Sequence, residues 1–461
     1  RPTWGRAIFY SCEKLAYLLG IQLIILYTAQ EPVSNEPAFL VRKDTKTFME
    51  SHAQEENIQP GPLEGIRIVE YAIWHAGPGA SAILGDMGAE IIKIESLQGD
   101  PERMQKGLGG LKFDLGGNSE RSFLFELSNR NKKGICLDIK TEKGRAVFHR
   151  LVESADVFLT NLRNSTKPKL GIDYPSLAKI NPKIVHASVS GFGTKGPMRD
   201  IGAFDPMGQA VSGMMFLTSD DEPVLLQTVI LDQMTSIAAS HAIVSGLLVR
   251  ERQGIGQEVH VSLYSSALWL THANLLVTSL MKKNPIGRWD RLGSTPLRNC
   301  YRCKDGEWIM GTNQPESKFW EMFCRLTEQP QLLEDTRFKD EGSRSKHIPE
   351  LMAVFDEVLL TKTRDQWIAL FQENGMMFAP VQKLEEVLDD PQALLNHYVE
   401  DFDHPEFGTV KVPGFPVSFS ANRTGTRTAA PLLGEHTDSV LQDIGYSPPE
   451  IEKLKDEGII N

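Results

Sequence analysis

The sequence predicts an α/β protein whose core is a doubly wound parallel sheet, accompanied by a smaller second domain. From Gly65 onward, short apolar runs typical of buried strands alternate with helical segments. A helix between consecutive strands supplies the crossover that parallel strands require. Strands that are apolar over most of their length indicate a sheet covered on both faces.

The elements of this sheet follow one another along the chain in a regular order. We expect strands at residues 66–72, 89–95, 132–139, 156–160, 184–189 and 258–263. Helices are expected at 77–87, 144–155 and 231–250, the last rich in small residues. From about residue 285 to 384 tryptophan, phenylalanine, lysine and glutamate are frequent and the alternation weakens. This change in composition predicts the second domain, and residues 385–461 return with a strand-like run and a final helix.

The first 60 residues differ in pattern from the rest of the chain. Residues 15–29 are mostly apolar, but this run is shorter than the about 20 residues of a membrane span. Met49 follows a polar stretch and precedes the first expected strand. We interpret Met49 as a natural start and residues 1–48 as a non-native or dispensable extension, within an N-terminal segment 1–60 that precedes the large domain. We expect no membrane partner, the alternative being a membrane-associated arm. The expected domains are then 61–284, 285–384 and 385–461.

Charge and cysteine content narrow the class of protein. The net charge of −11, from 49 basic and 60 acidic residues, argues against a nucleic-acid partner. Five cysteines in 461 residues do not make a disulfide framework, and Cys300 and Cys303 form the one C-x-x-C. Without a second such pair we interpret them as two thiols on a strand and expect no metal. A reducing, cytoplasmic location fits this composition.

A glycine pattern in the first β-α turn raises one candidate function. Gly77 and Gly79 follow the first strand and open a helix, and Glu95 ends the next strand. This is the context of a dinucleotide fingerprint, so an NAD-dependent dehydrogenase is an alternative. Pro78 weakens it, because proline removes one N–H donor at the turn.

Two aspartates at expected helix starts are the candidate catalytic residues. Asp232 follows an apolar segment and opens the small-residue helix, and Asp205 opens the helix before it. Either residue can be interpreted as a helix N-cap. The positive end of a helix also keeps a carboxylate ionised, and such a carboxylate can attack a thioester carbonyl.

Several other side chains lie where ligands bind in open α/β sheets, beyond the carboxyl ends of the strands. His75 is in the first β-α loop and Asn161 follows the strand at 156–160. A basic cluster of Arg130, Lys132 and Lys133 suits the phosphates of a coenzyme, or a solvated strand entry.

Taken in order, these segments resemble the family III CoA-transferases, which include formyl-CoA transferase and the carnitine and bile-acid CoA-transferases. The resemblance covers the chain from about Leu63 to its end. The matching stretches are LEGIRIVE, AGPGASAILGDMGAEIIKIE, GDPER, NRNKKGICLDIKTEKG, ADVFLTNLR, LGIDYPSLAKINPKIVHASVSGFGTKGP, GAFDPMGQAVSG, VILDQMTS, RQGIGQEVHVSL, CKDGEWI, DDPQ and AAPLLGEHT.

The resemblance implies a Rossmann-like large domain built from both chain ends and two interlocked subunits, as a homodimer or a heteromer with a homologue. It implies an acyl-CoA donor, a carboxylic acid acceptor, coenzyme A as part of the substrate, and no redox cofactor. The position of Asp232 carries the acyl group and then coenzyme A in this family, and Asp205 is a secondary acid. By the same matching, His75, Ala76, Leu137 and Asn161 line the coenzyme channel. From the basic cluster we expect Lys132 to bind the coenzyme phosphates.

Two departures from the family pattern bear on the reaction. The formyl-CoA branch has a run of glycines over its active site, whereas residues 291–295 here contain one glycine, which argues against oxalate and formate. The 2-methylacyl-CoA racemases share the fold and are a second alternative. They use a histidine where this chain has Tyr174-Pro175-Ser176, and His186 comes later, on a strand. A silent subunit is a third alternative, against which the presence of Asp232 argues.

Overall fold

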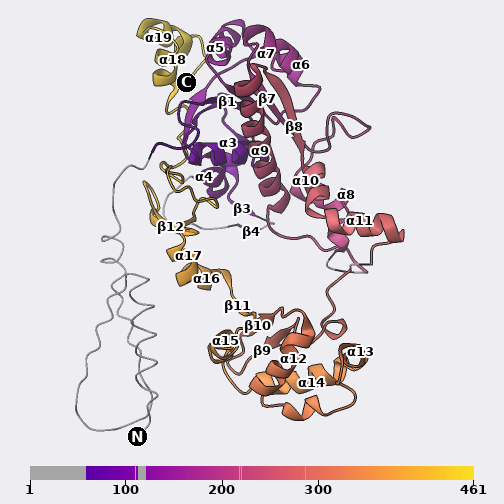
Figure 1. The fold of residues 1–461 in the computed structure, drawn as a ribbon. Helices are drawn as coiled ribbons and strands as arrows, with labels where there is room; N and C mark the ends of the chain where they lie inside the picture. The colour runs from indigo at the N-terminus through magenta and orange to yellow at the C-terminus, as the bar shows by residue number, and fades with distance from the viewer. Residues whose placement is uncertain (1–58, 109–110, 113–120, 218, 220, 286) are drawn as a thin grey trace, which may run out of the picture. The chain divides into compact units, whose positions relative to one another are not determined.

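The computed structural model describes residues 59–108, 111–112, 121–217, 219, 221–285 and 287–461 (Figure 1). The apolar run at 15–29 and the start predicted at Met49 lie outside the described residues. The predictions about the N-terminal extension therefore stay predictions.

A six-stranded parallel sheet forms the core, which confirms the predicted α/β class. Its order is β5 (Lys132–Cys136), β2 (Glu90–Glu95), β1 (Arg67–Tyr71), β6 (Val157–Thr160), β7 (Val185–Ser190) and β8 (Gln257–Ser262). The chain runs outward from β1 in both directions, because β2 and β6 pair with its two edges. The carboxyl end of β1 is therefore a topological switch point, where ligands of such sheets bind.

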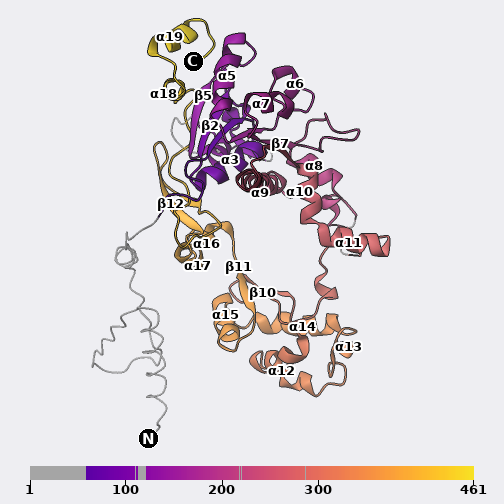
Figure 2. The same cartoon turned by 45° about the horizontal axis from the view of Figure 1, so that its top comes forward.

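Helices cover both faces of this sheet. On one face α5 (Glu142–Glu153), α7 (Tyr174–Ile180), α18 (Thr437–Asp443) and α19 (Pro448–Asp456) enclose a core that includes Val69 and Ile92. On the other, α3 (Ala76–Asp86), α9 (Ile230–Gln253) and α10 (Leu263–Leu270) enclose a core that includes Ile68 and Ile91. Figures 1 and 2 both place α18 beside the sheet and α5. The C-terminal helices α18 and α19 thus complete a core to which the early strands β1 and β2 also contribute.

Helices α3 and α9 pack closely because both carry small residues. A Cβ atom added at Gly79 would lie 2.5 Å from Oγ of Ser236 on α9. One added at Gly77 would lie 3.1 Å from Cβ of Ala72 and 3.3 Å from the Asn161 side chain. The glycines of the dinucleotide-like pattern therefore have a packing reason that needs no nucleotide.

Residues 297–378 contain a hydrophobic core of their own. An antiparallel sheet of β11 (Phe378–Val381), β10 (Trp308–Gly311) and β9 (Cys300–Arg302) packs with α12 (Glu316–Leu326), α14 (Ile348–Leu359) and α15 (Arg364–Glu373). This core lies inside the range predicted for the smaller domain. Cys300 is on β9 and Cys303 is buried just after it, both as free thiols, and no group of metal-binding side chains occurs among the described residues.

The remaining elements are a hairpin and several helices. The hairpin pairs β12 (Val399–His404) with β13 (Gly408–Pro413), and the helices that matter for the site are α4 (Phe123–Asn129) and α8 (Asp205–Val211). Within the described part of the chain, no helix has the length and apolar character to cross a membrane. The other elements are η1 (Pro101–Met104), β3 (Gly107–Leu108), β4 (Leu111–Lys112), α6 (Lys167–Leu170), η2 (Met214–Phe216), α11 (His272–Met281), η3 (Arg291–Gly293), η4 (Pro330–Leu333), α13 (Glu341–Arg344), α16 (Leu384–Val387) and α17 (Pro391–Leu395).

Candidate active site

Asp232 lies in the first turn of α9, two residues after the helix begins at Ile230. The residue before the helix, Val229, makes no side-chain cap. Instead Asp205 caps this helix from α8, since its Oδ2 accepts hydrogen bonds from the backbone N–H of Leu231 (2.6 Å) and of Asp232 (3.3 Å). The interpretation of Asp232 as an N-cap is therefore wrong, and this leaves its carboxylate available for chemistry.

Asp205 is itself held in place. It is the first residue of α8 and only 4% exposed, and its Oδ1 accepts a hydrogen bond of 2.6 Å from Nε2 of Gln209. The same glutamine accepts from the backbone N–H of Leu226 (3.1 Å) through its Oε1 atom. Asp205 thus connects the start of α9 to α8 and is not a cap of its own helix.

The environment of Asp232 favours its protonated form more than water does. Burial, followed by repulsion from Asp205, raises the pKa of Asp232 to about 7. At neutral pH a substantial part of the carboxyl groups is therefore ionised, and each is poorly solvated. A poorly solvated carboxylate loses little hydration when it attacks, which suits a nucleophile.

His75 joins the starts of α3 and α9. It is 5% exposed, its Nε2 is 2.8 Å from Nε2 of Gln233 on α9, and its Nδ1 is 2.6 Å from Oγ of Ser128 on α4. Burial, together with repulsion from Arg130, lowers the pKa of His75 to about 4, although the Gln233 hydrogen bond opposes this. His75 is therefore a neutral imidazole at neutral pH, and its partner Gln233 directly follows Asp232 along α9.

Asn161 and Ala76 complete the group that the fold brings together at the end of β1. Oδ1 of Asn161 accepts a hydrogen bond of 3.0 Å from the Ile73 N–H, and its amide donates to the Ile73 carbonyl. The carbonyl of Ala76 accepts a hydrogen bond of 3.0 Å from Oγ of Ser236. Of the predicted site residues, these two therefore hold the loop that carries His75.

The loop before α3 also contains Trp74, which was not among the predicted site residues. Trp74 has a φ of 60°, its N–H donates to Asp100 (3.1 Å), and its ring meets Phe204 edge-on at 5.3 Å. A non-glycine residue in the left-handed region is strained and is held there by its contacts. Its place next to His75 is the one signal for Trp74 in the sequence, and no sequence pattern signals Ser128 or Gln233.

Two predicted coenzyme residues lie in different surroundings. The Lys132 side chain is completely buried, and its Nζ donates to Glu70 (2.7 Å), to the Pro78 carbonyl (2.8 Å) and to Asn129 (3.0 Å). All three donors are used inside the protein, so the phosphate role predicted for Lys132 finds no free donor. The Leu137 side chain is fully buried in the core on the α5 face of the sheet.

The residues of the alternative functions also have internal partners. Glu95, the proposed ribose ligand of a dehydrogenase, makes two hydrogen bonds to Arg103 (2.6 and 2.7 Å) and accepts from the Asp100 N–H (2.9 Å). His186, considered for a racemase, is fully buried in the strand β7 and bonds the Ile172 carbonyl through Nε2 (2.9 Å). Neither side chain faces an open site.

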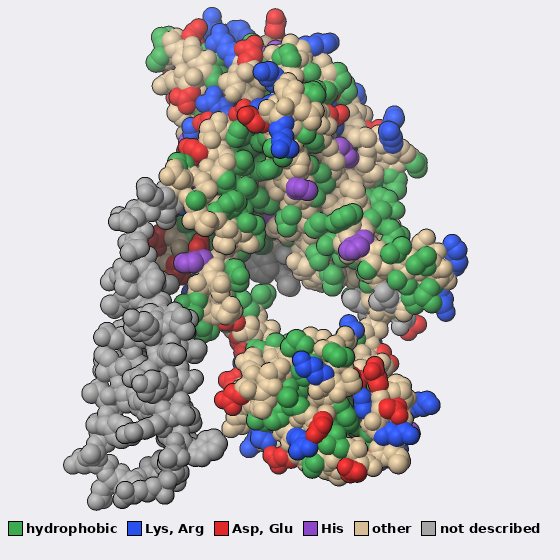
Figure 3. All heavy atoms as spheres, viewed as in Figure 1, with side chains coloured by type: hydrophobic (Ala, Val, Ile, Leu, Met, Phe, Trp, Pro, Cys, Tyr) green, Lys and Arg blue, Asp and Glu red, His purple; other side chains and the backbone are tan. Residues whose placement is uncertain are grey.

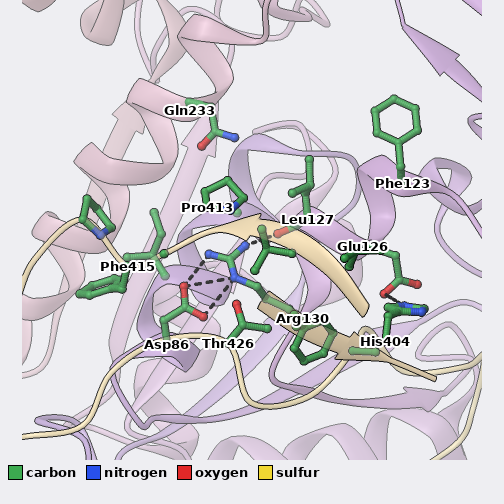
Figure 4. A pocket seen from close by; sticks show the side chains of 18 of the residues that line it. Asp86, Phe123, Glu126, Leu127, Arg130, Gln233, His404, Pro413, Phe415 and Thr426 are labelled. Carbon is green, nitrogen blue, oxygen red and sulfur yellow. Dashed lines mark hydrogen bonds and ion pairs between the residues drawn. The ribbon is translucent and has the colours of Figure 1, made fainter. Parts of the chain in front are cut away.

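A cavity of about 400 Å³ extends along α3 from His75 and Gln233 (Figure 4). The β12–β13 hairpin and the segment that follows it form one wall with mostly apolar side chains, including Phe402, Val412 and Phe415. An ion pair of Arg130 with Asp86 (2.5 Å) and a hydrogen-bond contact of His404 Nε2 with Glu126 (3.2 Å) lie at its border. The cavity is lined by His75 and by Gln233, the residue that follows Asp232 along α9.

Comparison with known proteins gives consistent matches over most of the chain. The model of a family described as CoA-transferase family III matches residues 63–437. The chain is 30% identical over 401 residues to (R)-2-hydroxy-4-methylpentanoate CoA-transferase of Clostridioides difficile, covering 86% of this chain and 99% of that protein. It is 32% identical over 407 residues to mouse succinyl-CoA:glutarate CoA-transferase, covering 87% and 90%. Among solved structures, a CAIB/BAIF family protein from Brucella suis superposes with a TM-score of 0.73 at 28% identity, covering 84% of this chain and all of that one.

Proposed function

The chain belongs to CoA-transferase family III, and we propose that it moves coenzyme A from an acyl-CoA donor to a free carboxylic acid with Asp232 as the covalent carrier. The observation that carries the proposal is the carboxylate of Asp232 in the first turn of α9, which has no hydrogen bond or ion pair with the residues that the structure describes. The helix cap is supplied by Asp205, so this carboxylate is not used in holding the fold.

The reaction follows four balanced substitutions. The Asp232 carboxylate attacks the thioester carbonyl and expels coenzyme A as a thiolate, which leaves an aspartyl–acyl anhydride. The thiolate then attacks the Asp232 carbonyl, releases the donor acid and leaves an aspartyl–coenzyme A thioester. The acceptor carboxylate displaces the thiolate to form a second anhydride. The thiolate finally attacks the acceptor carbonyl, which releases the new acyl-CoA and restores Asp232.

The coenzyme site is proposed at the carboxyl end of β1. His75 and Ala76 begin α3 there, and Asn161 extends from the neighbouring strand β6 to the same loop. Leu137 belongs to this proposed channel through its place just after β5, although its side chain lies in the core. The four residues follow the carboxyl ends of β1, β6 and β5, three strands of one parallel sheet in which β2 lies between β5 and β1, and this edge is where an open α/β sheet binds a ligand.

We further propose that two subunits associate. Large apolar side chains are exposed on α10 and α11, where Trp269 is 70%, Leu276 61% and Leu280 73% exposed. Figure 3 shows hydrophobic side chains gathered on the surface of this part of the molecule. An apolar patch of this kind usually marks a protein interface, and a second copy of the chain in an interlocked homodimer fits it. We place the enzyme in the cytoplasm, in accord with its free cysteines.

The names of the relatives differ in their acids, so the donor and acceptor of this chain are open to experiment. One relative is named for a branched hydroxy acid and the other for glutarate. Both names describe transfer of coenzyme A, which leaves the racemase and the dehydrogenase without support from them.

The aspartyl intermediate predicts a trapped adduct on one peptide. The full chain is incubated with succinyl-CoA or acetyl-CoA, quenched with hydroxylamine, digested and measured by mass spectrometry. We expect the peptide containing Asp232 to carry the hydroxamate, because hydroxylamine attacks an activated aspartyl carbonyl. The modification should be absent from Asp232→Ala and present in Asp443→Ala, an exposed aspartate on α18. An unmodified Asp232 peptide with several donors would contradict the covalent mechanism.

The pH dependence of the first half-reaction follows from the pKa of Asp232. Because only the ionised carboxylate attacks, kcat/KM for the acyl-CoA donor should rise with pH and reach half its plateau near pH 7. Removing the charge of Asp205 with Asp205→Asn should move this midpoint to lower pH, since Asp205 repels the negative form of Asp232. Steady-state rates from pH 5 to 9 measure both midpoints, and a rate that falls between pH 5 and 7 is incompatible with this assignment.

A further inference from the structure

His75 is buried between hydrogen-bonding groups of two helices, the buried Ser128 on α4 and the exposed Gln233 on α9. Ser128 on α4 lies 2.6 Å from its Nδ1, and Gln233 on α9 lies 2.8 Å from its Nε2. Ser128 is fully buried. Both ring nitrogens of His75 therefore have partners, and a neutral imidazole must donate through one and accept through the other.

Glu102 lies behind this chain and is an unusual carboxyl group. It is 1% exposed, and its Oε1 is 3.9 Å from Nδ1 of His75. Its Oε2 has no hydrogen-bond partner in the part of the chain that the structure describes. The neighbouring hydroxyl of Ser128 favours the charged form of Glu102.

The nearby cations are occupied by other carboxylates. Lys93 makes ion pairs with Glu70 and Asp100, both at 2.9 Å, and Arg103 pairs with Glu95. Burial and repulsion from Asp100 therefore raise the pKa of Glu102 to about 8, against the weaker attraction of Lys93. A protonated carboxyl at neutral pH still has a carbonyl oxygen that can accept a hydrogen bond from the Ser128 hydroxyl.

These contacts are mutually consistent in one arrangement of protons. The Gln233 amide donates to Nε2 of His75 and Nδ1–H of His75 donates to Ser128, which leaves the Ser128 hydroxyl proton free to turn toward the neighbouring Glu102. We propose that Ser128 and Glu102 are positioning residues that hold His75 as the neutral Nδ1–H tautomer, so that its Nε2 fixes the Gln233 side chain at the start of α9. This role deepens the proposed CoA transfer and rests on it, because Gln233 follows the nucleophile Asp232 directly.

The tautomer can be measured without any assay of CoA transfer. Nitrogen-15 spectra of the full chain labelled at its 11 histidines distinguish Nδ1–H from Nε2–H imidazoles. The His75 signals are assigned by their loss in His75→Gln. We expect an Nδ1–H pattern that does not titrate between pH 5.5 and 8. An Nε2–H pattern, or titration near pH 6.5, in the wild-type protein would overturn the proposal.

Variants of the two positioning residues test the chain of contacts. Ser128→Ala removes the acceptor of the Nδ1 proton and should shift His75 toward the Nε2–H form. Glu102→Leu should shift His75 part of the way toward the Nε2–H form. Glu102→Gln keeps a neutral carbonyl acceptor and should retain the wild-type tautomer. An unchanged His75 tautomer in folded Ser128→Ala would contradict the assignment, and the wild-type spectrum decides it if that variant does not fold.

A rate measurement connects the tautomer to the reaction. We expect Ser128→Ala to lower kcat for CoA transfer roughly ten-fold with the KM for acyl-CoA nearly unchanged, the effect of losing about one hydrogen bond in the site. The control Ser240→Ala removes a buried serine of α9 whose hydroxyl donates to the Ile237 carbonyl of the same helix, and this variant should keep the wild-type rate. A shifted tautomer with an unchanged rate would refute the positioning role. A wild-type protein with the expected tautomer but no CoA transfer would instead refute the proposed function.

Discussion

Replacing Asp232 by asparagine is expected to lower kcat for CoA transfer by at least about 10³-fold, because the amide lacks the ionisable oxygen that forms the anhydride. Asparagine has nearly the same size and shape as aspartate, so the packing of α9 should stay unchanged. The loss of transfer rate therefore reports on the chemical step. Rates with succinyl-CoA or acetyl-CoA and a panel of carboxylic acids give the comparison. A variant that retains more than about a tenth of the wild-type rate would exclude Asp232 as the carrier.

The same substitution should make the protein more stable above neutral pH. The pKa of Asp232 is raised to about 7 in the folded protein, against 3.8 as its ordinary value, so the folded state binds the proton more tightly than the unfolded state does. The ionised form of Asp232 therefore lowers the free energy of unfolding. This destabilisation is fully present above pH 7 and decreases as the pH falls from 7 toward 4. Asp232→Asn avoids this cost, which is about 2–4 kcal/mol from the size of the pKa shift.

Thermal unfolding at pH 8 and pH 4.5 measures this difference. We expect a higher Tm for Asp232→Asn than for the wild type at pH 8 and nearly equal values at pH 4.5. A variant that is less stable than the wild type at both pH values would show that Asp232 serves the fold, and would contradict the assignment of its carboxylate to chemistry.

The second large effect is expected from Lys93→Met, which removes a fully buried ammonium group. Nζ of Lys93 contacts Glu70 (2.9 Å), Asp100 (2.9 Å) and the Ala72 carbonyl (3.0 Å). Burial would lower the pKa of Lys93, but these two carboxylates raise it well above its usual value. Without this cation Asp100 keeps a buried charge with no ammonium in contact, which should cost about 3–5 kcal/mol of unfolding free energy.

The consequence of Lys93→Met extends to the active site, because Asp100 accepts the Trp74 N–H and so holds the loop before His75. Thermal or chemical unfolding measures the loss of stability, and the transfer rate measures the loss of loop position. Lys133→Met is the matched control on strand β5, since Lys133 is 39% exposed in its side chain and pairs with Glu90 at the surface. It should change stability by less than about 1 kcal/mol, and an equally small effect of Lys93→Met would refute the role of the buried network.

The sequence predicts the sheet well because its signals are local. All six strands of the sheet begin and end within three residues of their expected positions, as with residues 184–189 for β7 and 132–139 for β5. Apolar runs and small-residue helices depend on the side chains within a few residues of each other, so they can be recognised without knowledge of the tertiary structure. The ordered motifs of the resemblance identified the family for the same reason, since they cover the chain from about Leu63 onward.

The roles of charged side chains could not be predicted in this way. Lys132 stands in a basic run that suits coenzyme phosphates, but its ammonium lies between Glu70 and the Pro78 carbonyl in the interior. In the sequence, Asp232 and Asp205 are both aspartates at the start of a helix. In the structure, Asp205 caps the helix that carries Asp232, by accepting a hydrogen bond from a backbone N–H that lies 26 residues further along the chain. Partners of this kind are distant in sequence, and only the folded chain brings them within hydrogen-bonding distance.

By itself, the sequence determined the parallel α/β architecture, the family and the candidate carboxylates, because these depend on local periodicity and on ordered motifs. The tertiary structure alone decided that Asp205 and not Asp232 caps α9, that His75 lies between Ser128 and Gln233, and that Glu102 is buried close to Asp100. Burial and through-space charge determine the proton affinities of these groups, and neither quantity exists until the strands and helices have packed.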